Sequence, residues 1–334
     1  MHYQEREKYG NGYRKTYQEG MMQLLETLQH NSAKVRSSYI QEIHENPDAF
    51  RDRVRRTLGW PLTTPVRENC NVRRSLVATD EGVSIYRIQI EIQPDVWMYG
   101  ILFLQEGDQK RPLVIAQHGG LGTPEFCSSF FDSENYNDMT RRILAKGVHV
   151  FCPQLLLWDV KRFGRGELDR NQYDAALKHV GSSVAAVELD GLQKCLDYLQ
   201  TLPQVDSDAI GMIGLSYGGF YTLYLTALDT RIKAALCSCY FNDRSKFTAY
   251  DWTWFGSDNV FGDAEIAALV GPRKLWLQVG DNDELFPVKG AEREYARLKA
   301  ILNGQCDNYR FEIFPGVHEF GKSDDGIDFI INAL

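Results

Sequence analysis

Long hydrophobic runs are missing from this chain of 334 residues. A helix that crosses a membrane needs roughly 18 consecutive apolar residues, and no stretch of the sequence reaches that length. Residues 1–8 are mostly polar and lack the apolar centre of a signal peptide. We therefore expect a cytoplasmic protein that has no membrane partner.

An excess of positive charge is missing as well. The chain holds 37 lysine and arginine residues against 45 aspartate and glutamate residues, which gives a formal net charge of −8. The basic residues are scattered along the sequence, whereas proteins that bind nucleic acids gather them on one face. We expect no nucleic-acid partner.

Signs of a cofactor are also missing. The seven cysteines lack the paired spacing of a metal site, and we expect reduced thiols, most of them buried. No Gly-x-Gly-x-x-Gly motif follows the first predicted buried strand, which argues against a dinucleotide-binding turn. We expect neither a metal nor an organic cofactor.

The sequence divides into two regions of different composition and periodicity. The N-terminal region is polar and helix-prone, and apolar residues such as Met21 and Leu25 recur in it at helical spacing. The prolines within residues 61–65 then break the helical pattern. We predict an N-terminal helical extension over residues 1–65 and one large domain over residues 66–334.

The second region reads as an α/β domain. Apolar and polar residues alternate between 73 and 105, which predicts antiparallel strands with turns near residues 80–82 and 94–95. Short apolar runs then alternate with helical stretches, which predicts a mainly parallel central sheet with helices on both faces. The predicted buried strands are residues 113–116, 148–151, 210–213, 234–236, 275–279 and 311–314.

The strongest motif is Gly-x-Ser-x-Gly, with Ser216 at its centre. It follows a predicted strand and precedes an apolar, helix-like stretch, as in a nucleophile elbow. The sharp turn of such an elbow requires small residues two positions before and after the serine, here Gly214 and Gly218. A serine hydroxyl is a poor nucleophile near neutral pH, so it needs a histidine to accept its proton and a carboxylate to orient that histidine.

Both partners follow later strands. Asp281 and Asp283 come just after the strand at 275–279, and His318 comes just after the strand at 311–314. The carboxyl ends of parallel strands meet at one edge of the sheet, and the order serine, aspartate, histidine is that of an α/β-hydrolase triad. Either aspartate could supply the acid.

From about residue 73 onward the chain resembles an α/β hydrolase, closest to the dienelactone-hydrolase and acetyl-xylan-esterase-like branch. In that family a Gly-x-x-Asp sequence is followed closely by a proline, and Gly280 to Asp283 with Pro287 fits this pattern. The resemblance therefore favours Asp283 as the acid, and Asp281 is interpreted as a turn residue that binds its own backbone.

Hydrolysis of an acyl bond also needs backbone N–H groups that face the developing oxyanion. The residue after the nucleophile, Tyr217, supplies one candidate, and the loop at 117–122 supplies another. Resemblance to His-Gly-x loops favours Gly120 there. His118 is expected to shape this loop through hydrogen bonds rather than to act as a base.

Aromatic residues offer candidates for a substrate pocket. Trp158 lies in a long polar segment that we expect to overhang the site, and Trp252 and Trp254 follow a later strand. Such rings stack on sugars or line acyl pockets. The alternative is that they pack a loop onto the body of the protein. Nearby charges at Lys161, Arg162 and Arg165 could attract an anionic substrate, but a solvated loop is the simpler interpretation.

These residues predict a serine hydrolase that cleaves a small-molecule ester. The resemblance implies a short-acyl carboxylesterase acting on an acetylated carbohydrate or another small ester. A serine peptidase of the acylaminoacyl or prolyl-oligopeptidase type is the nearest alternative, but the large N-terminal propeller of that group is absent from residues 1–65. A non-catalytic, hydrolase-like binding protein is the third hypothesis. The N-terminal helices could form a homo-oligomer or cover the active-site entrance.

Overall fold

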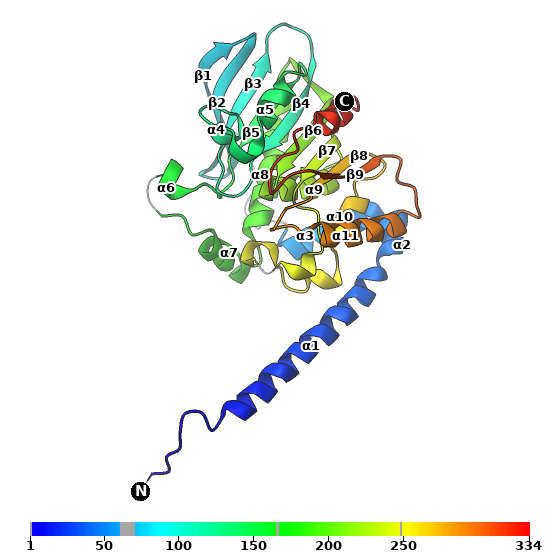
Figure 1. The fold of residues 1–334 in the computed structure, drawn as a ribbon. Coiled ribbons are helices and arrows are strands. Elements are labelled where there is room, and N and C mark those ends of the chain that lie inside the picture. Colours follow the sequence, from blue (N-terminus) through cyan, green and yellow to red (C-terminus); the bar gives the residue numbers. More distant parts are fainter. Residues whose placement is uncertain (1, 61–70, 165–166, 248) are drawn as a thin grey trace.

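A nine-stranded sheet forms the centre of the molecule, in the order β1-β2-β3-β5-β4-β6-β7-β8-β9 (Figure 1). The computed structural model describes residues 2–60, 71–164, 167–247 and 249–334. Strands β1 to β3 and the pairing of β3 with β5 are antiparallel, and every pairing from β5 to β9 is parallel. The predicted mainly parallel sheet is confirmed.

The antiparallel edge is a meander. Asp80 pairs with Val83 across the first turn, and Gln93 pairs with Val96 across the second, so both predicted turns are present. The three strands are β1 (Val72–Asp80), β2 (Val83–Gln93) and β3 (Val96–Gln105).

All six buried strands expected from apolar runs are present. Their central residues are mostly apolar because helices cover both faces of the sheet, whereas the edge strand β9 also carries the exposed Arg310 and the half-buried Glu312. Their bounds are β4 (Arg111–Gln117), β5 (His149–Pro153), β6 (Val205–Leu215), β7 (Ile232–Ser238), β8 (Lys274–Gly280) and β9 (Tyr309–Phe314).

The helices form two layers, each with its own hydrophobic core against one face of the sheet. The larger layer contains α3 (Pro47–Leu58), α8 (Val184–Leu199), α9 (Tyr217–Leu228), α10 (Asp263–Ala268) and α11 (Val288–Ile301). The smaller layer contains α4 (Pro124–Cys127), α5 (Met139–Leu144) and α12 (Asp325–Ile331).

Shorter elements lie in the connections. The helices there are α2 (Ile40–Glu45), α6 (Val160–Phe163) and α7 (Arg170–His179). Single 3-10 turns are η1 (Glu134–Tyr136), η2 (Arg244–Lys246), η3 (Tyr250–Trp252) and η4 (Ser257–Asn259).

The N-terminal helices differ from one another. In α3, Phe50, Val54 and Leu58 are fully buried in the larger core. By contrast, α1 (Asn11–Ser37) has no buried residue and leaves the body as a single long helix (Figure 1). The predicted boundary at residues 61–65 lies outside the described residues, and the division at residue 65 stays a prediction.

Two further findings concern the expectations from composition. Within the described ranges, no helix combines the length and apolar character needed to cross a membrane. The six described cysteines are free thiols, of which all but Cys306 are buried, and Cys70 lies outside the described residues.

Candidate active site

Ser216 occupies a sharp turn between β6 and α9. Its backbone angles are φ 60° and ψ −120°, a conformation that a non-glycine residue rarely adopts. A Cβ atom at Gly214 would lie 2.3 Å from the carbonyl oxygen of Gly218, and one at Gly218 would lie 2.2 Å from that of Gln117. Both positions therefore require glycine, as the elbow motif predicts. Strain held at a single serine is typical of a functional site.

Asp283 lies beyond the end of β8 and is 5% exposed. Its Oδ1 accepts hydrogen bonds from the backbone N–H groups of Leu285 and Phe286, both at 2.9 Å. Its Oδ2 is 2.8 Å from Nδ1 of His318. Burial alone would raise the pKa of Asp283, but the His318 hydrogen bond and the two amides outweigh burial and lower the pKa below its usual value. The carboxylate is therefore charged near neutral pH.

His318 follows β9, so its loop faces the loop of Asp283 across neighbouring parallel strands. Because Nδ1 is bonded to the carboxylate, Nε2 is the nitrogen that can take up a proton. The ring of Phe286 stacks against the imidazole at 5.5 Å between centroids and 20° between planes. The histidine is thus fixed from two sides.

Asp281 has a different environment. Its Oδ1 accepts a hydrogen bond from the backbone N–H of Gly316 at 2.9 Å and one from the side-chain amide of Asn282 at 2.7 Å. The sequence interpretation placed its bond within its own turn, but the bond instead reaches the loop that carries His318. Asp281 therefore supports the histidine loop, and Asp283 contacts the imidazole.

Ser216 and His318 line one pocket of about 440 Å³ at the carboxyl edge of the sheet. Its other walls are largely apolar. They are formed by Gly119, Gly120, Leu121, Asn135, Tyr217, Phe247, Trp252, Leu285 and Phe286. The pocket thus brings together both oxyanion candidates, the serine and the histidine, while Asp283 lies behind the histidine ring.

The loop after β4 leaves few amides for an oxyanion. The N–H of Gly119 donates to the Tyr136 hydroxyl at 2.9 Å, and the N–H of Gly122 donates to the Gly119 carbonyl at 3.3 Å. Of Gly119, Gly120 and Gly122, Gly120 is therefore the one whose N–H remains as a donor candidate. Tyr217 is the first residue of α9, where backbone N–H groups have no partner within the helix.

His118 is buried beneath this loop. Its Nδ1 donates to the Gly119 carbonyl at 2.8 Å, and its Nε2 accepts from the N–H of Leu155 at 3.0 Å. Burial lowers the pKa of His118 to about 4, so the ring is neutral at neutral pH. The imidazole joins the loops after β4 and β5, which is the shaping role expected from the sequence.

The three tryptophan candidates lie in three different places. Trp252 lines the pocket, with its ring 4.2 Å from that of Tyr217. Trp254 does not line it; its ring is buried in the larger core, stacked on Phe220 at 6.1 Å. Trp158 lines a neighbouring cavity of about 500 Å³ and pairs with Leu121 through a backbone bridge.

The basic residues near Trp158 lie on the surface and do not line the pocket. Arg162 donates to Glu134 at 2.8 Å on the surface, and Lys161 is exposed in α6. Arg165 lies outside the described residues. Neither described cation lines the pocket, which favours the solvated interpretation.

Several pocket residues were missed by sequence reasoning. Phe247 and Phe286 stack on one another at 4.9 Å, and Leu285 is 60% exposed beside them. Asn135 lies in η1, and its side-chain amide donates to the His318 carbonyl at 3.4 Å. For Phe286, closeness in sequence to Asp283 was an available signal. Nothing in the sequence marks Asn135 or Phe247, because their loops carry no motif.

A buried charged network supports Tyr217, the residue after Ser216. The Tyr217 hydroxyl donates to Asp251 at 3.0 Å, and Asp251 accepts from Nε of Arg170 at 2.6 Å. Arg170 also binds Glu188 at 2.9 Å and Tyr221 at 2.8 Å. This network joins α7, α8, α9 and η3 directly behind the pocket, and sequence reasoning did not anticipate it.

The donor atoms of Cys239, Asp283 and His318 lie within 4.8 Å of one another, a grouping that could in principle hold a metal ion. Asp283 and His318 are already bonded to each other, and the Cys239 thiol donates to the Glu319 carbonyl at 3.2 Å. Burial raises the pKa of Cys239 to about 12, which disfavours the thiolate that metals prefer. The thiol is best described as packing beneath the aspartate and histidine.

A model of the dienelactone hydrolase family matches residues 126–329, more than half of the chain. The chain belongs to this family. The matched region contains the elbow, both aspartates and His318, so the resemblance inferred from those residues is confirmed.

Similarity to a curated protein is more limited. Over 125 residues the chain is 32% identical to YtaP of Bacillus subtilis (strain 168), a hydrolase by name. The aligned part is 34% of this chain and spans 42% of that relative.

Solved structures share the fold over most of their length. A glucuronoyl esterase from Solibacter usitatus is similar with a TM-score of 0.65 and 14% identity, covering 87% of this chain and 93% of that one. Acetyl xylan esterase 1 from Thermoanaerobacterium sp. JW/SL YS485 is similar with a TM-score of 0.60 and 14% identity, and the match covers 86% of this chain and 94% of that one. These likenesses concern the fold, and with the family match they confirm the expected α/β-hydrolase architecture.

Proposed function

We propose that this chain is a serine carboxylesterase that cleaves small esters through an acyl-enzyme. The observation that carries the proposal is the hydrogen bond between Asp283 and His318 in the wall of a pocket that also contains Ser216. The elbow geometry at Ser216 supports the same role, because the strained turn after β6 places the residue in the pocket wall.

In the first half of the reaction, Ser216 Oγ attacks the ester carbonyl carbon and its proton passes to His318 Nε2. Asp283, already charged, stabilises the imidazolium that forms. The carbon–oxygen bond to the alcohol then breaks, and the alcohol leaves with the proton from His318. In the second half, water attacks the acyl-enzyme by the same route, and the carboxylic acid leaves.

The backbone N–H groups of Tyr217 and Gly120 are the proposed donors to the tetrahedral oxyanion. Both residues line the pocket beside the serine. Each such donor is worth roughly 10² to 10³ in kcat in other enzymes. The side chain of Tyr217 supports this role indirectly, because its hydroxyl bond to Asp251 holds the residue at the start of α9.

Pocket size and lining indicate a small ester. A volume of about 440 Å³ with walls of Leu285, Phe286 and Trp252 suits a short acyl group and a small alcohol. Two proteins of the same fold bear the names acetyl xylan esterase and glucuronoyl esterase. We therefore favour an acetylated carbohydrate or another small ester as the substrate class. The cytoplasmic location and the lack of a nucleic-acid partner stay predictions.

Hydrolysis of p-nitrophenyl esters from acetate to octanoate tests this function. We expect activity that falls as the acyl chain lengthens and that disappears in Ser216→Ala. Wild-type protein that cleaves none of the esters, or a Ser216→Ala variant that keeps the activity, would contradict the proposal and bring peptide substrates or a binding role forward.

A further inference from the structure

Helix α1 is the one long helix in the described ranges whose residues are all exposed or only half-buried. Its 27 residues make it about 40 Å long at the usual rise of an α-helix. It extends away from the body into open space (Figure 1). Large apolar side chains are nevertheless exposed along it, among them Tyr17, Met21, Leu24, Leu25, Leu28 and Val35. An isolated helix gains little from such side chains.

The spacing of these residues is regular. Positions 17, 21, 24, 28, 31 and 35 alternate steps of four and three, which is the a/d pattern of a coiled coil. Five of the six are large and apolar, with side chains 44% to 73% exposed, and Asn31 is the polar exception. We call this row the α1 stripe. A single polar residue in such a row is the usual device that fixes register between two helices.

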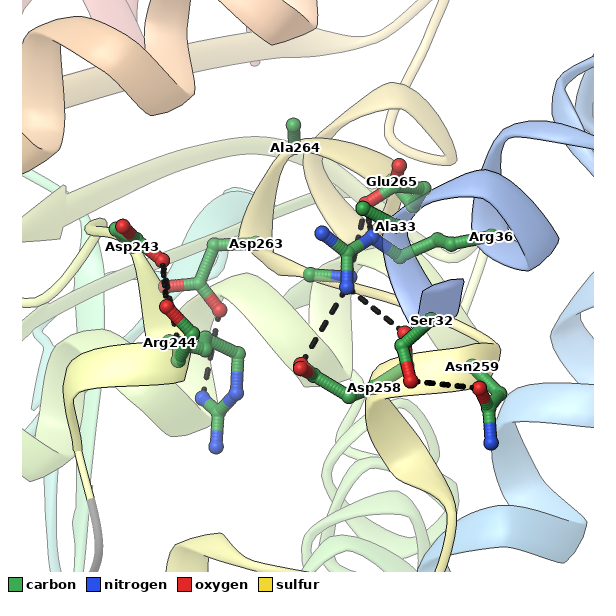
Figure 2. A network of polar contacts seen from close by, with 12 residues as sticks. Ser32, Ala33, Arg36, Asp243, Arg244, Asp258, Asn259, Asp263, Ala264 and Glu265 are labelled. Carbon is green, nitrogen blue, oxygen red and sulfur yellow. Dashed lines mark hydrogen bonds and ion pairs between the residues drawn. The ribbon is translucent and has the colours of Figure 1, made fainter. Parts of the chain in front are cut away.

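The base of the helix is held firmly on the body (Figure 2). Arg36 donates to the carbonyl of Asp258 at 2.8 Å and to its carboxylate at 3.3 Å. The same guanidinium lies 3.5 Å from the carboxylate of Glu265, which is fully buried. Ser32 donates to Asn259 at 2.7 Å.

These contacts bind the last turns of α1 to η4 and α10, so the direction of the helix is set by its base. Bending back onto the body would require these bonds to break. No residue of α1 lines the pocket, and the helix projects away from the body (Figure 1). The covering of the α1 stripe must therefore come from outside this copy of the chain.

Charge along the helix limits what the partner can be. Between residues 16 and 33 the only ionised side chains are Glu19 and Glu26, and both fall on the side opposite the stripe. The absence of lysine and arginine over this length does not suit an anionic membrane surface, which attracts basic residues beside an apolar face. Two identical stripes, by contrast, meet without like charges facing each other.

We propose that the α1 stripe pairs with the same stripe of a second copy, so that two chains form a homodimer through a two-helix coiled coil. A two-fold axis makes any such stripe complementary to itself. Burying the five apolar side chains of the stripe at roughly 100 Å² each covers on the order of 500 Å² per chain. Over both chains this is about 1,000 Å², the size at which specific interfaces between proteins begin. The inference stands apart from the proposed esterase activity.

The test measures molar mass in solution. Light scattering and sedimentation are run on the full wild-type chain, on Leu24→Glu/Leu28→Glu, and on Gln23→Glu/Gln29→Glu as a control that adds the same charges off the stripe. We expect a dimer for the wild type and the control, and a monomer for the stripe variant, with the dissociation constant raised at least about a hundredfold. Equal cooperative thermal unfolding of both variants shows that the body remains folded.

A wild-type chain that stays monomeric at the highest concentration measured would overturn the proposal, as would a stripe variant that remains dimeric. Binding of monomeric wild type to lipid vesicles of phosphatidylcholine and phosphatidylserine would also overturn it, and would assign the stripe to a membrane. Ester hydrolysis measured in the same samples keeps the two proposals distinct, because the stripe variant is expected to retain the wild-type rate per chain.

Discussion

Asp281 and Asp283 show how closely spaced residues of one type take different roles. The first binds the backbone of the histidine loop, and the second binds the imidazole itself. Asp283→Asn leaves the shape of the site but replaces a charged acceptor with an amide that cannot stabilise an imidazolium. We expect kcat for p-nitrophenyl acetate to fall on the order of 10⁴-fold.

Asp281→Asn is the matched control. Its amide oxygen can still accept from Gly316, so we expect kcat to stay within about tenfold of wild type. If the larger loss belonged to Asp281→Asn, the assignment of Asp283 as the acid would be wrong.

Sequence reasoning reached the three proposed catalytic residues but only part of the pocket. Ser216, Asp283 and His318 each follow a buried strand, and parallel strands bring such positions to one edge without knowledge of the loops. Trp252 and Trp254 could not be separated in this way. Both rings lie near Phe220, at 6.3 Å and 6.1 Å, but of the two only Trp252 lines the pocket, and no periodicity in the sequence records that difference.

At the scale of elements, the apolar runs predicted every parallel strand because buried strands contain little else. The roles of the N-terminal helices could not be read in the same way. Both α1 and α3 carry apolar residues at helical spacing, yet α3 is buried and α1 is exposed. Spacing shows that a helix has an apolar face but does not show what covers it.

The buried network around Arg170 is the main polar link between elements near the site. Replacing Arg170 with methionine would leave Glu188 and Asp251 buried without their cation. Loss of one member of a buried ion pair costs about 3–5 kcal/mol in other proteins. We expect a loss of that order in the free energy of unfolding, measured by urea denaturation.

Arg162→Met is the control, because Arg162 forms an ion pair with Glu134 while its side chain is 41% exposed. Surface pairs contribute about 1 kcal/mol or less. Equal losses for the two variants would show that the Arg170 network is no more important than a surface pair.

At the scale of the whole molecule, stability should depend on pH through Glu294. This carboxyl is buried beside Asp263 and Glu265, and burial is the main reason why its pKa is raised to about 8 from 4.5. Above pH 4.5 the unfolded chain releases this proton while the folded chain retains it. The stabilising contribution is therefore present below pH 4.5 and is lost as pH rises through about 8.

Glu294→Gln removes this titration and keeps an oxygen that can accept from the N–H of Ala264. We expect the variant to gain stability relative to wild type between pH 5 and pH 8, by on the order of 3 kcal/mol. Thermal unfolding across this range measures the difference. If the difference in stability between the variant and the wild type does not change with pH, Glu294 titrates normally.

The central claim for the whole molecule is that Ser216 is a nucleophile activated by His318. Its most direct measurement is the intact mass after treatment with a fluorophosphonate, which reacts with activated serines by losing fluoride. We expect one covalent adduct per chain, placed on Ser216 by peptide mapping, with none on Ser216→Ala and much slower labelling of His318→Gln. Wild-type protein that stays unlabelled, or that is labelled at another serine, would contradict the account.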